Sequence, residues 1–283
     1  MFTEMSEQKS GGRTPVILVT NDDGINAKGI KALVDMVKPF GRIVVVAPDE
    51  GNSGMSHAIT SKLPLRLKKR KGEVEGVEYY SADGTPADCV KLAMNQVFTV
   101  QPDLLVSGIN HGSNSSVSIF YSGTMGATIE GCLYGIPSIG FSLLDFSSDA
   151  DFSGAVAFGR QVVKQVLEKG LATDTCLNVN IPVLPVDAIK GIKVCRQNRG
   201  VWREEFEKRT DPHGRDYFWL TGYFHNSEPN ATDTDEWALN NGYVSVVPIH
   251  IDLTAYAEVE RIKQWDFMTD EASVSKQNVE QSS

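Results

Sequence analysis

Short runs of apolar, mostly β-branched residues alternate with amphipathic segments along most of this chain of 283 residues. The first run spans residues 15–20 and ends at a polar turn, which begins at Asn21. A continuous run of this kind is typical of a strand buried on both faces, as in a parallel sheet that helices cover. Apolar residues then recur at helical spacing between positions 30 and 37, and a second apolar run follows at 43–47. The order strand, helix, strand predicts a right-handed parallel unit, the first sign of a doubly wound sheet.

The alternation continues to residue 251. Thr85 and Pro86 are typical of the start of a helix, because Thr caps free backbone amides and Pro fits the first helical position. No internal repeat or long linker interrupts the pattern, so we predict one α/β domain with an appended arm. Further strands are predicted at 103–107, 137–143, 177–181, 192–194 and 244–251, and further helices from Ser122, from about residue 158 and from Trp237.

Residues 199–222 differ in character, because charged and aromatic residues surround a turn at 211–214. We predict a β-hairpin arm outside the periodic core, and an apolar arm of this kind usually contacts another subunit. The predicted organisation is a domain of residues 15–198 plus 223–262, an oligomerisation hairpin at 199–222, a disordered leader at 1–14 and a disordered tail at 271–283.

The net charge of −9 narrows the choice of partners. It disfavours a nucleic-acid polymer or an anionic membrane as the main partner, although a bound metal ion can still attract a small anionic substrate. No segment is apolar over the length that a membrane span requires, and the polar amino terminus lacks the apolar core of a signal peptide. The four cysteines form no CxxC pair, which favours buried thiols in a reducing compartment. We therefore predict a cytoplasmic protein.

Two adjacent carboxylates, Asp22 and Asp23, follow the first predicted strand, and Gly24 lets the chain turn after them. Ligands of open α/β sheets bind at the carboxyl ends of the strands. Neighbouring carboxylates repel each other unless a cation or a proton lies between them, and Mg²⁺ or Mn²⁺ is the natural cation for oxygen ligands. The alternative is an ordinary surface turn, in which these residue types are favoured for local reasons.

The loop at 49–57 follows the second predicted strand, so it should open on the same edge of the sheet. Asn52 and Ser53 offer amide and hydroxyl groups there. A flexible turn is the simpler explanation of the local sequence. His57, in the same loop, is interpreted as a structural or supporting residue.

Polar groups also follow the strand predicted at 103–107, where Asn110 and Asn114 lie among small residues. The run 122–124, Ser-Gly-Thr, then begins a helix whose free amides and hydroxyls can bind an anion. Helix capping alone accounts for the same residues. Because three predicted strand ends carry carboxylates, amides and hydroxyls beside this helix start, the sequence favours a metal and phosphate site.

Several motifs occur in a fixed order between about Val16 and Tyr256. They are Thr-Asn-Asp-Asp-Gly at 20–24, Ala-Pro-Asp at 47–49, Asn-Ser-Gly at 52–54, Gly-Thr-Pro-Ala-Asp-Cys at 84–89, Ser-Gly-Ile-Asn at 107–110, Tyr-Ser-Gly-Thr at 121–124, Asn-Gly-Tyr-Val-Ser-Val at 241–246 and Asp-Leu-Thr at 252–254. With these motifs the sequence resembles the survival protein E family, the surE nucleotidases.

The resemblance implies a Rossmann-like catalytic domain and a carboxyl-terminal hairpin that subunits exchange, which gives a homodimer or homotetramer. It implies a metal-dependent phosphatase that acts on nucleoside 5′- and 3′-monophosphates and, in some members, also on polyphosphate. One divalent ion per subunit, Mg²⁺ or Mn²⁺, is then expected. Carried over by position, the catalytic residues are Asp22 and Asp23, the metal ligands are Asp22, Asp23, Ser53 and Asn110, and the phosphate-binding residues are Asn52, Asn114, Ser122, Gly123 and Thr124.

This sequence departs from the pattern of the family in two places. Many members carry a basic residue where Asn52 stands, and acidic residues in the loop at 115–120, which here is Ser-Ser-Val-Ser-Ile-Phe. The substrate preference therefore does not follow from the resemblance. The residues also leave open whether water attacks the phosphate directly or an aspartyl-phosphate forms.

Two other classes of protein fit parts of the pattern. A receiver-like signalling module would bind magnesium at the acidic pair beside a phosphorylated Asp49, but the chain is longer than such a module and carries the additional segment 110–124. A metal-dependent deacetylase would need histidine ligands, for which His57 and His111 are the candidates.

Overall fold

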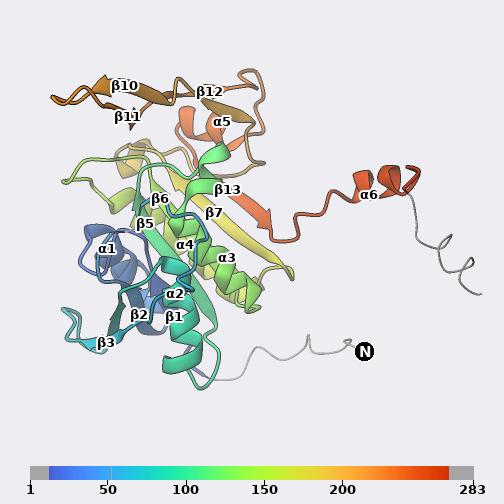
Figure 1. The fold of residues 1–283 in the computed structure, drawn as a ribbon. Helices are drawn as coiled ribbons and strands as arrows, with labels where there is room; N and C mark the ends of the chain where they lie inside the picture. Colours follow the sequence, from blue (N-terminus) through green and yellow to red (C-terminus); the bar gives the residue numbers. More distant parts are fainter. Residues whose placement is uncertain (1–12, 52, 268–283) are drawn as a thin grey trace, which may run out of the picture. The chain divides into compact units, whose positions relative to one another are not determined.

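A nine-stranded sheet forms the centre of the structure (Figure 1). The structure is a computed structural model, and it describes residues 13–51 and 53–267. The strand order is β3-β4-β2-β1-β5-β6-β7-β13-β8, which confirms the predicted doubly wound, mostly parallel sheet. The parallel strands are β4 (Glu78–Ala82), β2 (Arg42–Pro48), β1 (Val16–Thr20), β5 (Leu104–His111), β6 (Ser138–Leu143) and β7 (Thr175–Ile181). Of the remaining strands, β3 (Leu67–Arg70) is antiparallel to β4, β13 (Val244–His250) is antiparallel to β7, and β8 (Ile192–Val194) is parallel to β13.

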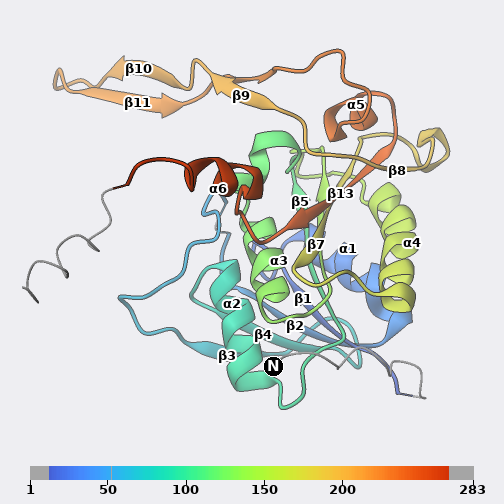
Figure 2. The same ribbon diagram turned by 90° about the vertical axis from the view of Figure 1, so that its right-hand side faces the viewer.

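Helices cover both faces of this sheet (Figure 2). The helices α1 (Lys28–Val37) and α4 (Ser153–Lys169) lie on one face, and α2 (Pro86–Leu92) and α3 (Gly123–Leu133) lie on the other. Side chains of β1 alternate between the two layers: Ile17 and Val19 pack with α1 and α4, whereas Leu18 packs with α2 and α3. Burial on both faces is the reason why this strand has no polar position in its interior.

The remaining elements of the domain are short helices and strands. The predicted helix start at Thr85 is confirmed, because the Thr85 hydroxyl accepts from the Asp88 amide at 3.1 Å and the Asp88 carboxylate accepts from the Thr85 amide at 3.0 Å. The strand β4 was not predicted, because its half-buried Tyr79 and Tyr80 do not make an apolar run. The other short helical elements are Lys38–Phe40, Ala93–Val97, Ser116–Tyr121, Val186–Ala188 and α5 (Asp235–Asn240).

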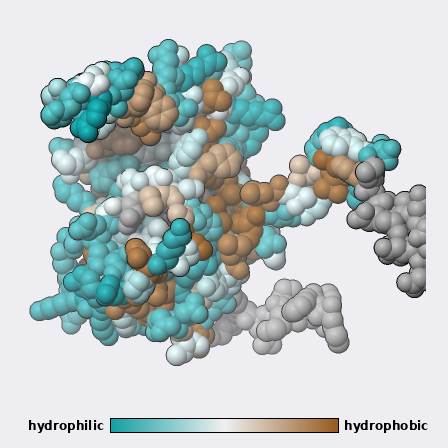
Figure 3. Space-filling view, in the orientation of Figure 1, coloured by the Kyte–Doolittle hydropathy of each residue, from teal (hydrophilic) through white to brown (hydrophobic). Residues whose placement is uncertain are grey.

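A two-stranded ribbon occupies the segment that was predicted as a hairpin. The strands β10 (Phe206–Thr210) and β11 (Asp216–Leu220) pair with each other, and β9 (Gly200–Arg203) pairs with β12 (Tyr223–Asn226). The pairing therefore continues to Asn226, beyond the predicted boundary at residue 222. The ribbon exposes large apolar side chains, and the space-filling view shows apolar atoms among hydrophilic ones in this region (Figure 3).

The described residues divide into two compact units at Ile251 and Asp252. The second unit contains α6 (Tyr256–Ile262), where the Arg261 guanidinium lies 5.0 Å from the centre of the Trp265 ring. The domain boundary at residue 262 stays a prediction. The predicted tail and all but the last two residues of the predicted leader lie outside the described residues. Within the described part of the chain, no helix combines the length and the apolar character of a membrane span.

Candidate metal and phosphate site

Asp22 and Asp23 lie where β1 ends, and both carboxylates are withdrawn from solvent. Asp22 is only 3% exposed, and its Oδ1 accepts a hydrogen bond of 2.6 Å from the Thr124 hydroxyl. Asp23 is half-buried, and its Oδ2 lies 3.4 Å from the His111 backbone amide. Burial raises the pKa of Asp22 to about 6 against the effect of the Thr124 hydrogen bond, and burial raises the pKa of Asp23 as well. His111 lowers the pKa of Asp23 in part, but no lysine or arginine is among the groups that shift either pKa, so a bound cation would add positive charge that the acidic pair otherwise lacks.

The loop after β2 lies directly against the backbone of this acidic pair. Gly24 has a φ of +91°, and a Cβ placed there would lie 3.1 Å from the carbonyl carbon of Glu50. A Cβ on Gly51 would lie 3.5 Å from the Asp23 carbonyl oxygen. The close approach brings the loop that carries Ser53 to the acidic pair. Ser53 itself is exposed, and Asn52 lies outside the described residues.

Two glycines at the start of α3 let this helix approach Asp22 and the loop after β2 closely. A Cβ on Gly123 would lie 2.8 Å from the Asp22 Cβ, and a Cβ on Gly126 would lie 2.5 Å from the Ser56 carbonyl oxygen. The Ser122 hydroxyl accepts from the Met125 amide at 3.0 Å and so caps the helix. Because Thr124 donates to Asp22, the hydroxyls of this segment are engaged within the protein. The Gly123 amide has no acceptor among the described residues and is free to bind a phosphate oxygen.

Asn110 reaches the same edge through an irregularity in β5. The register of β5 against β6 shifts between Ser107 and Asn110, and Gly108 there has a φ of +123°. A Cβ on Gly108 would lie 2.3 Å from the Phe141 carbonyl oxygen, so this position requires glycine. The Asn110 amide nitrogen donates to the Gly112 carbonyl at 2.8 Å, which leaves the amide oxygen as the donor atom for a cation.

Asn114 lies four residues after Asn110 and belongs to a buried polar network. Its backbone amide donates to the Asn180 side chain, its side-chain amide donates to Ser142, and its carbonyl accepts from Asn178, each at 2.8 Å. These bonds hold the segment after β5 against β6 and β7. The predicted contact of Asn114 with phosphate stays a prediction.

The donor atoms at this edge fit a hard divalent cation. The candidate ligands are the two carboxylates, the Asn110 amide oxygen and the Ser53 hydroxyl, and oxygen ligands of these kinds are the ones that Mg²⁺ and Mn²⁺ prefer. The described residues contain no group of three or more His, Cys, Asp and Glu side chains placed to hold a metal ion. Asn21 was not predicted as a site residue, yet its buried Oδ1 has no hydrogen-bond partner among the described residues while its amide nitrogen donates to the Gly24 carbonyl at 2.9 Å. Its place beside the acidic pair was the signal that could have identified it.

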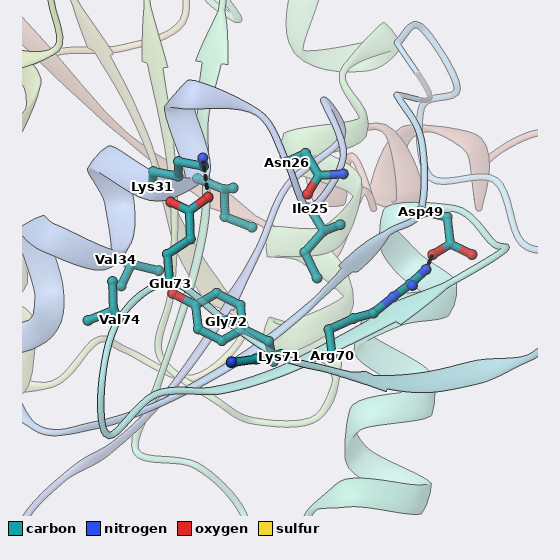
Figure 4. Close-up of a pocket in the computed structure, with 12 residues that line it drawn as sticks. Ile25, Asn26, Lys31, Val34, Asp49, Arg70, Lys71, Gly72, Glu73 and Val74 are labelled. Atoms are coloured by element: carbon teal, nitrogen blue, oxygen red, sulfur yellow. Dashed lines mark hydrogen bonds and ion pairs between the residues drawn. The ribbon is translucent and has the colours of Figure 1, made fainter.

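A cavity of about 390 Å³ lies nearby but on the other face of the sheet (Figure 4). Ile25 and residues of α1 line it, and an ion pair of 2.7 Å between Lys31 and Glu73 joins two of its walls. Asp49 also lines it and accepts from Lys68 at 3.0 Å and from Arg70 at 2.7 Å. Asp22 instead contacts α3 on the opposite face, so this cavity is separate from the acidic pair. Both carboxylate oxygens of Asp49 are engaged, which disfavours Asp49 as a phosphorylated residue.

We expect the stability of the metal-free protein to depend on pH through Asp22. A carboxyl group with a raised pKa binds a proton more tightly in the folded state, so its contribution is present below about pH 4 and is lost as the pH rises through about 6. The loss amounts to about 3 kcal/mol at most. Denaturant unfolding of the parent and of Asp22→Asn between pH 4 and 8 measures the effect. The variant should gain stability relative to the parent across this window, and a constant difference would contradict the raised pKa.

Comparisons with known proteins show to which family the chain belongs. The family model described as survival protein SurE matches residues 17–204. The chain is 51% identical over 252 residues to the "5'-nucleotidase SurE" of Flavobacterium psychrophilum, covering 89% of this chain and 98% of that relative. It is 44% identical over 262 residues to the protein of the same name from Chlorobium chlorochromatii, covering 92% and 94%. The crystal structure of the SurE protein from Aquifex aeolicus matches with a TM-score of 0.76 at 42% identity, covering 88% of this chain and 98% of that one. The chain therefore belongs to the survival protein SurE family.

Proposed function

We propose that this protein is a divalent-metal-dependent phosphomonoesterase that hydrolyses nucleoside 5′- and 3′-monophosphates to nucleoside and phosphate, and that it also shortens polyphosphate. The observation that carries the proposal is the acidic pair of buried Asp22 and half-buried Asp23, whose pKa values no lysine or arginine lowers and which lies beside the start of α3, where the Gly123 amide has no acceptor among the described residues. The name 5'-nucleotidase that the relatives bear supports the choice of a nucleotide as substrate.

One Mg²⁺ or Mn²⁺ per subunit would be held by Asp22, Asp23, Ser53 and Asn110. When bound, the ion neutralises charge on the phosphate and lowers the pKa of a coordinated water. Asn52, Asn114 and the run 122–124 are the proposed phosphate-binding residues. Of these, the Gly123 amide at the positive end of α3 is directed to an oxygen of the phosphate, where it stabilises developing charge.

The two carboxylates differ in what holds them, which suggests different roles. Asp22 is oriented by the short bond from Thr124, whereas the hydrogen bond of Asp23 to another described residue is the long contact of 3.4 Å from the His111 amide. Asp23 is therefore the group that accepts the proton of the attacking water, and the ester oxygen leaves with the nucleoside and takes up a proton from solvent. In the alternative mechanism, an aspartate attacks phosphorus itself. Rapid quenching with labelled substrate separates the two, because only the second leaves acid-stable phosphate on the protein.

The proposed activity is tested by phosphate release from 5′- and 3′-monophosphates of each nucleoside and from polyphosphate, with Mg²⁺ or Mn²⁺ added to chelator-treated protein. We expect many turnovers per subunit with monophosphates. Uptake of a single equivalent of phosphate without turnover would instead indicate a signalling module. The same panel decides between 5′ and 3′ preference and identifies the metal that gives the higher rate.

We further propose that the protein is a homodimer or homotetramer that acts in the cytoplasm. The arm exposes Phe206, Trp219 and Leu220, with exposed fractions of 67%, 58% and 72%, and such surfaces usually meet another subunit. The four cysteines are free and buried, which confirms the expected thiols and supports a reducing compartment.

Removing residues 206–220 should lower the number of subunits in the assembly. The Thr221 amide donates to the Glu205 carbonyl at 2.6 Å, so these two ends already lie together and a short turn can join them. The remaining pair of β9 and β12 should stay formed, and light scattering measures the mass. Glu207→Ala is the matched control, because it removes a charge from β10 and no apolar surface. An unchanged number of subunits after the deletion would show that the arm does not hold the subunits together.

A further inference from the structure

Glu130 is a buried carboxylate on α3 that the proposed chemistry does not use. Its side chain is 4% exposed, its Oε2 lies 2.8 Å from His57 Nε2, and its Oε1 accepts from Lys91 Nζ at 2.7 Å. Burial would raise the pKa of Glu130, but the hydrogen bonds from His57 and Lys91 outweigh burial and leave that pKa below its usual value. The carboxylate is therefore charged at neutral pH, and it connects three parts of the chain: α2, α3 and the loop after β2.

His57 belongs to a segment, residues 56–60, that is held closely against α2 and α3. The Ser56 amide donates to the Tyr121 carbonyl at 3.1 Å, and the Ser56 hydroxyl donates to the Phe120 carbonyl at 2.6 Å. Further along, the Thr60 amide donates to the Asp88 carboxylate at 3.0 Å. We call residues 56–60 the anchored segment. The Ser56 and Thr60 amides are backbone groups of the segment, whereas the Ser56 hydroxyl and the His57 ring are side-chain groups.

The residues just before the anchored segment have no comparable support. Gly51, Ser53, Gly54 and Met55 are exposed, and Ser53 makes no hydrogen bond to another described residue. At the other end of this loop, the ion pairs of Asp49 with Lys68 and Arg70 hold the chain. The position of Ser53 therefore depends on how firmly the two ends of the loop are held.

We infer that Glu130, acting through His57, is a positioning residue for the metal ligand Ser53. The inference rests on the proposed function, since it takes Ser53 as a ligand of the divalent ion. Glu130 holds the His57 side chain of the anchored segment, and it lies one helical turn beyond Gly126, where the backbone of Ser56 closely approaches α3. Without this hold, the loop samples more conformations, and fewer of them place the Ser53 hydroxyl beside Asp22 and Asp23. Partners that hydrogen-bond directly to a metal ligand commonly change metal affinity by about 10-fold to 100-fold, and because Glu130 acts on Ser53 through His57 we expect an effect at the lower end of this range.

A double-mutant cycle tests the inference by direct Mn²⁺ binding, measured by calorimetry on the metal-free protein without substrate. The proteins are the parent, Glu130→Gln, Ser53→Ala and the double variant. We expect Glu130→Gln to weaken Mn²⁺ binding by about 10-fold in the parent. In the Ser53→Ala background the same change should weaken binding by less than about 2-fold, because the residue through which Glu130 acts is gone. A merely structural role would give the same loss in both backgrounds.

Two further variants make the outcome decisive. His57→Ala breaks the same contact from the exposed side and should match Glu130→Gln, so the test survives if the buried substitution prevents folding. Glu168→Gln on α4, whose ion pair with Lys164 at 3.8 Å is exposed, is the matched control and should leave Mn²⁺ binding unchanged. Parent-like affinity in both Glu130→Gln and His57→Ala overturns the inference, as does an equal loss with and without Ser53. A parent protein that binds no Mn²⁺ overturns the proposed function itself, which is a different result.

Discussion

Replacing Asp23 with asparagine should reduce the turnover of a nucleoside monophosphate by about 100-fold or more. Asparagine keeps the shape and one neutral oxygen, but it removes a charge that a hard cation needs and the group that is free to accept a proton. Burial raises the pKa of Asp23, which means that the charged carboxylate is destabilised in the metal-free fold. A neutral asparagine should remove this unfavourable desolvation of charge. The melting temperature of the metal-free variant should therefore hold or rise while the rate falls.

The initial rate and the metal-free melting temperature are measured on the same preparation. Asp151→Asn is the matched control, because Asp151 is exposed and only accepts from Ser153 at the start of α4. That control should turn over substrate at the parent rate. If Asp23→Asn also keeps the parent rate and loses some stability, Asp23 is an ordinary turn residue and the site lies elsewhere.

Removing the divalent ion should abolish turnover and leave the fold intact. Several kcal/mol of charge stabilisation depend on a metal ion in such reactions, which corresponds to a loss of at least about 100-fold in rate. Stability should come mainly from the apolar layers on either side of the sheet, such as those around Ile17 and Leu18. Circular dichroism should therefore be unchanged in chelator.

The control for the chelation experiment is the recovery of the turnover rate when the metal is added back. Adding Mg²⁺ or Mn²⁺ back to the dialysed protein should restore the rate, whereas a protein that had unfolded would recover slowly or not at all. Full turnover after verified removal of the metal would contradict a metal-dependent mechanism, whatever the effect of Asp23→Asn.

The layered sheet and the location of the acidic pair were predictable because they depend on local patterns. An apolar run such as that of β1 has to be buried on both faces, and the turn after it has to lie at a strand end. The cap of α2 was equally local, since Thr85 and Asp88 satisfy each other within one helical turn. By contrast, β4 was missed, because its half-buried tyrosines carry no periodic signal of their own.

The sequence by itself therefore determined the fold class, the edge of the sheet that carries Asp22 and Asp23, and the residue types gathered there. Only the tertiary structure decided which groups are engaged with each other. The Thr124 hydroxyl, which the resemblance assigns to phosphate binding, donates to Asp22 across a separation of 102 residues, and the His57 ring pairs with Glu130 across 73 residues. The physical reason is that periodicity and helix capping act over a few residues, whereas hydrogen-bond partners between distant segments depend on how the layers pack. Glycines such as Gly126 set that packing distance, and nothing in their local sequence shows which backbone will approach them.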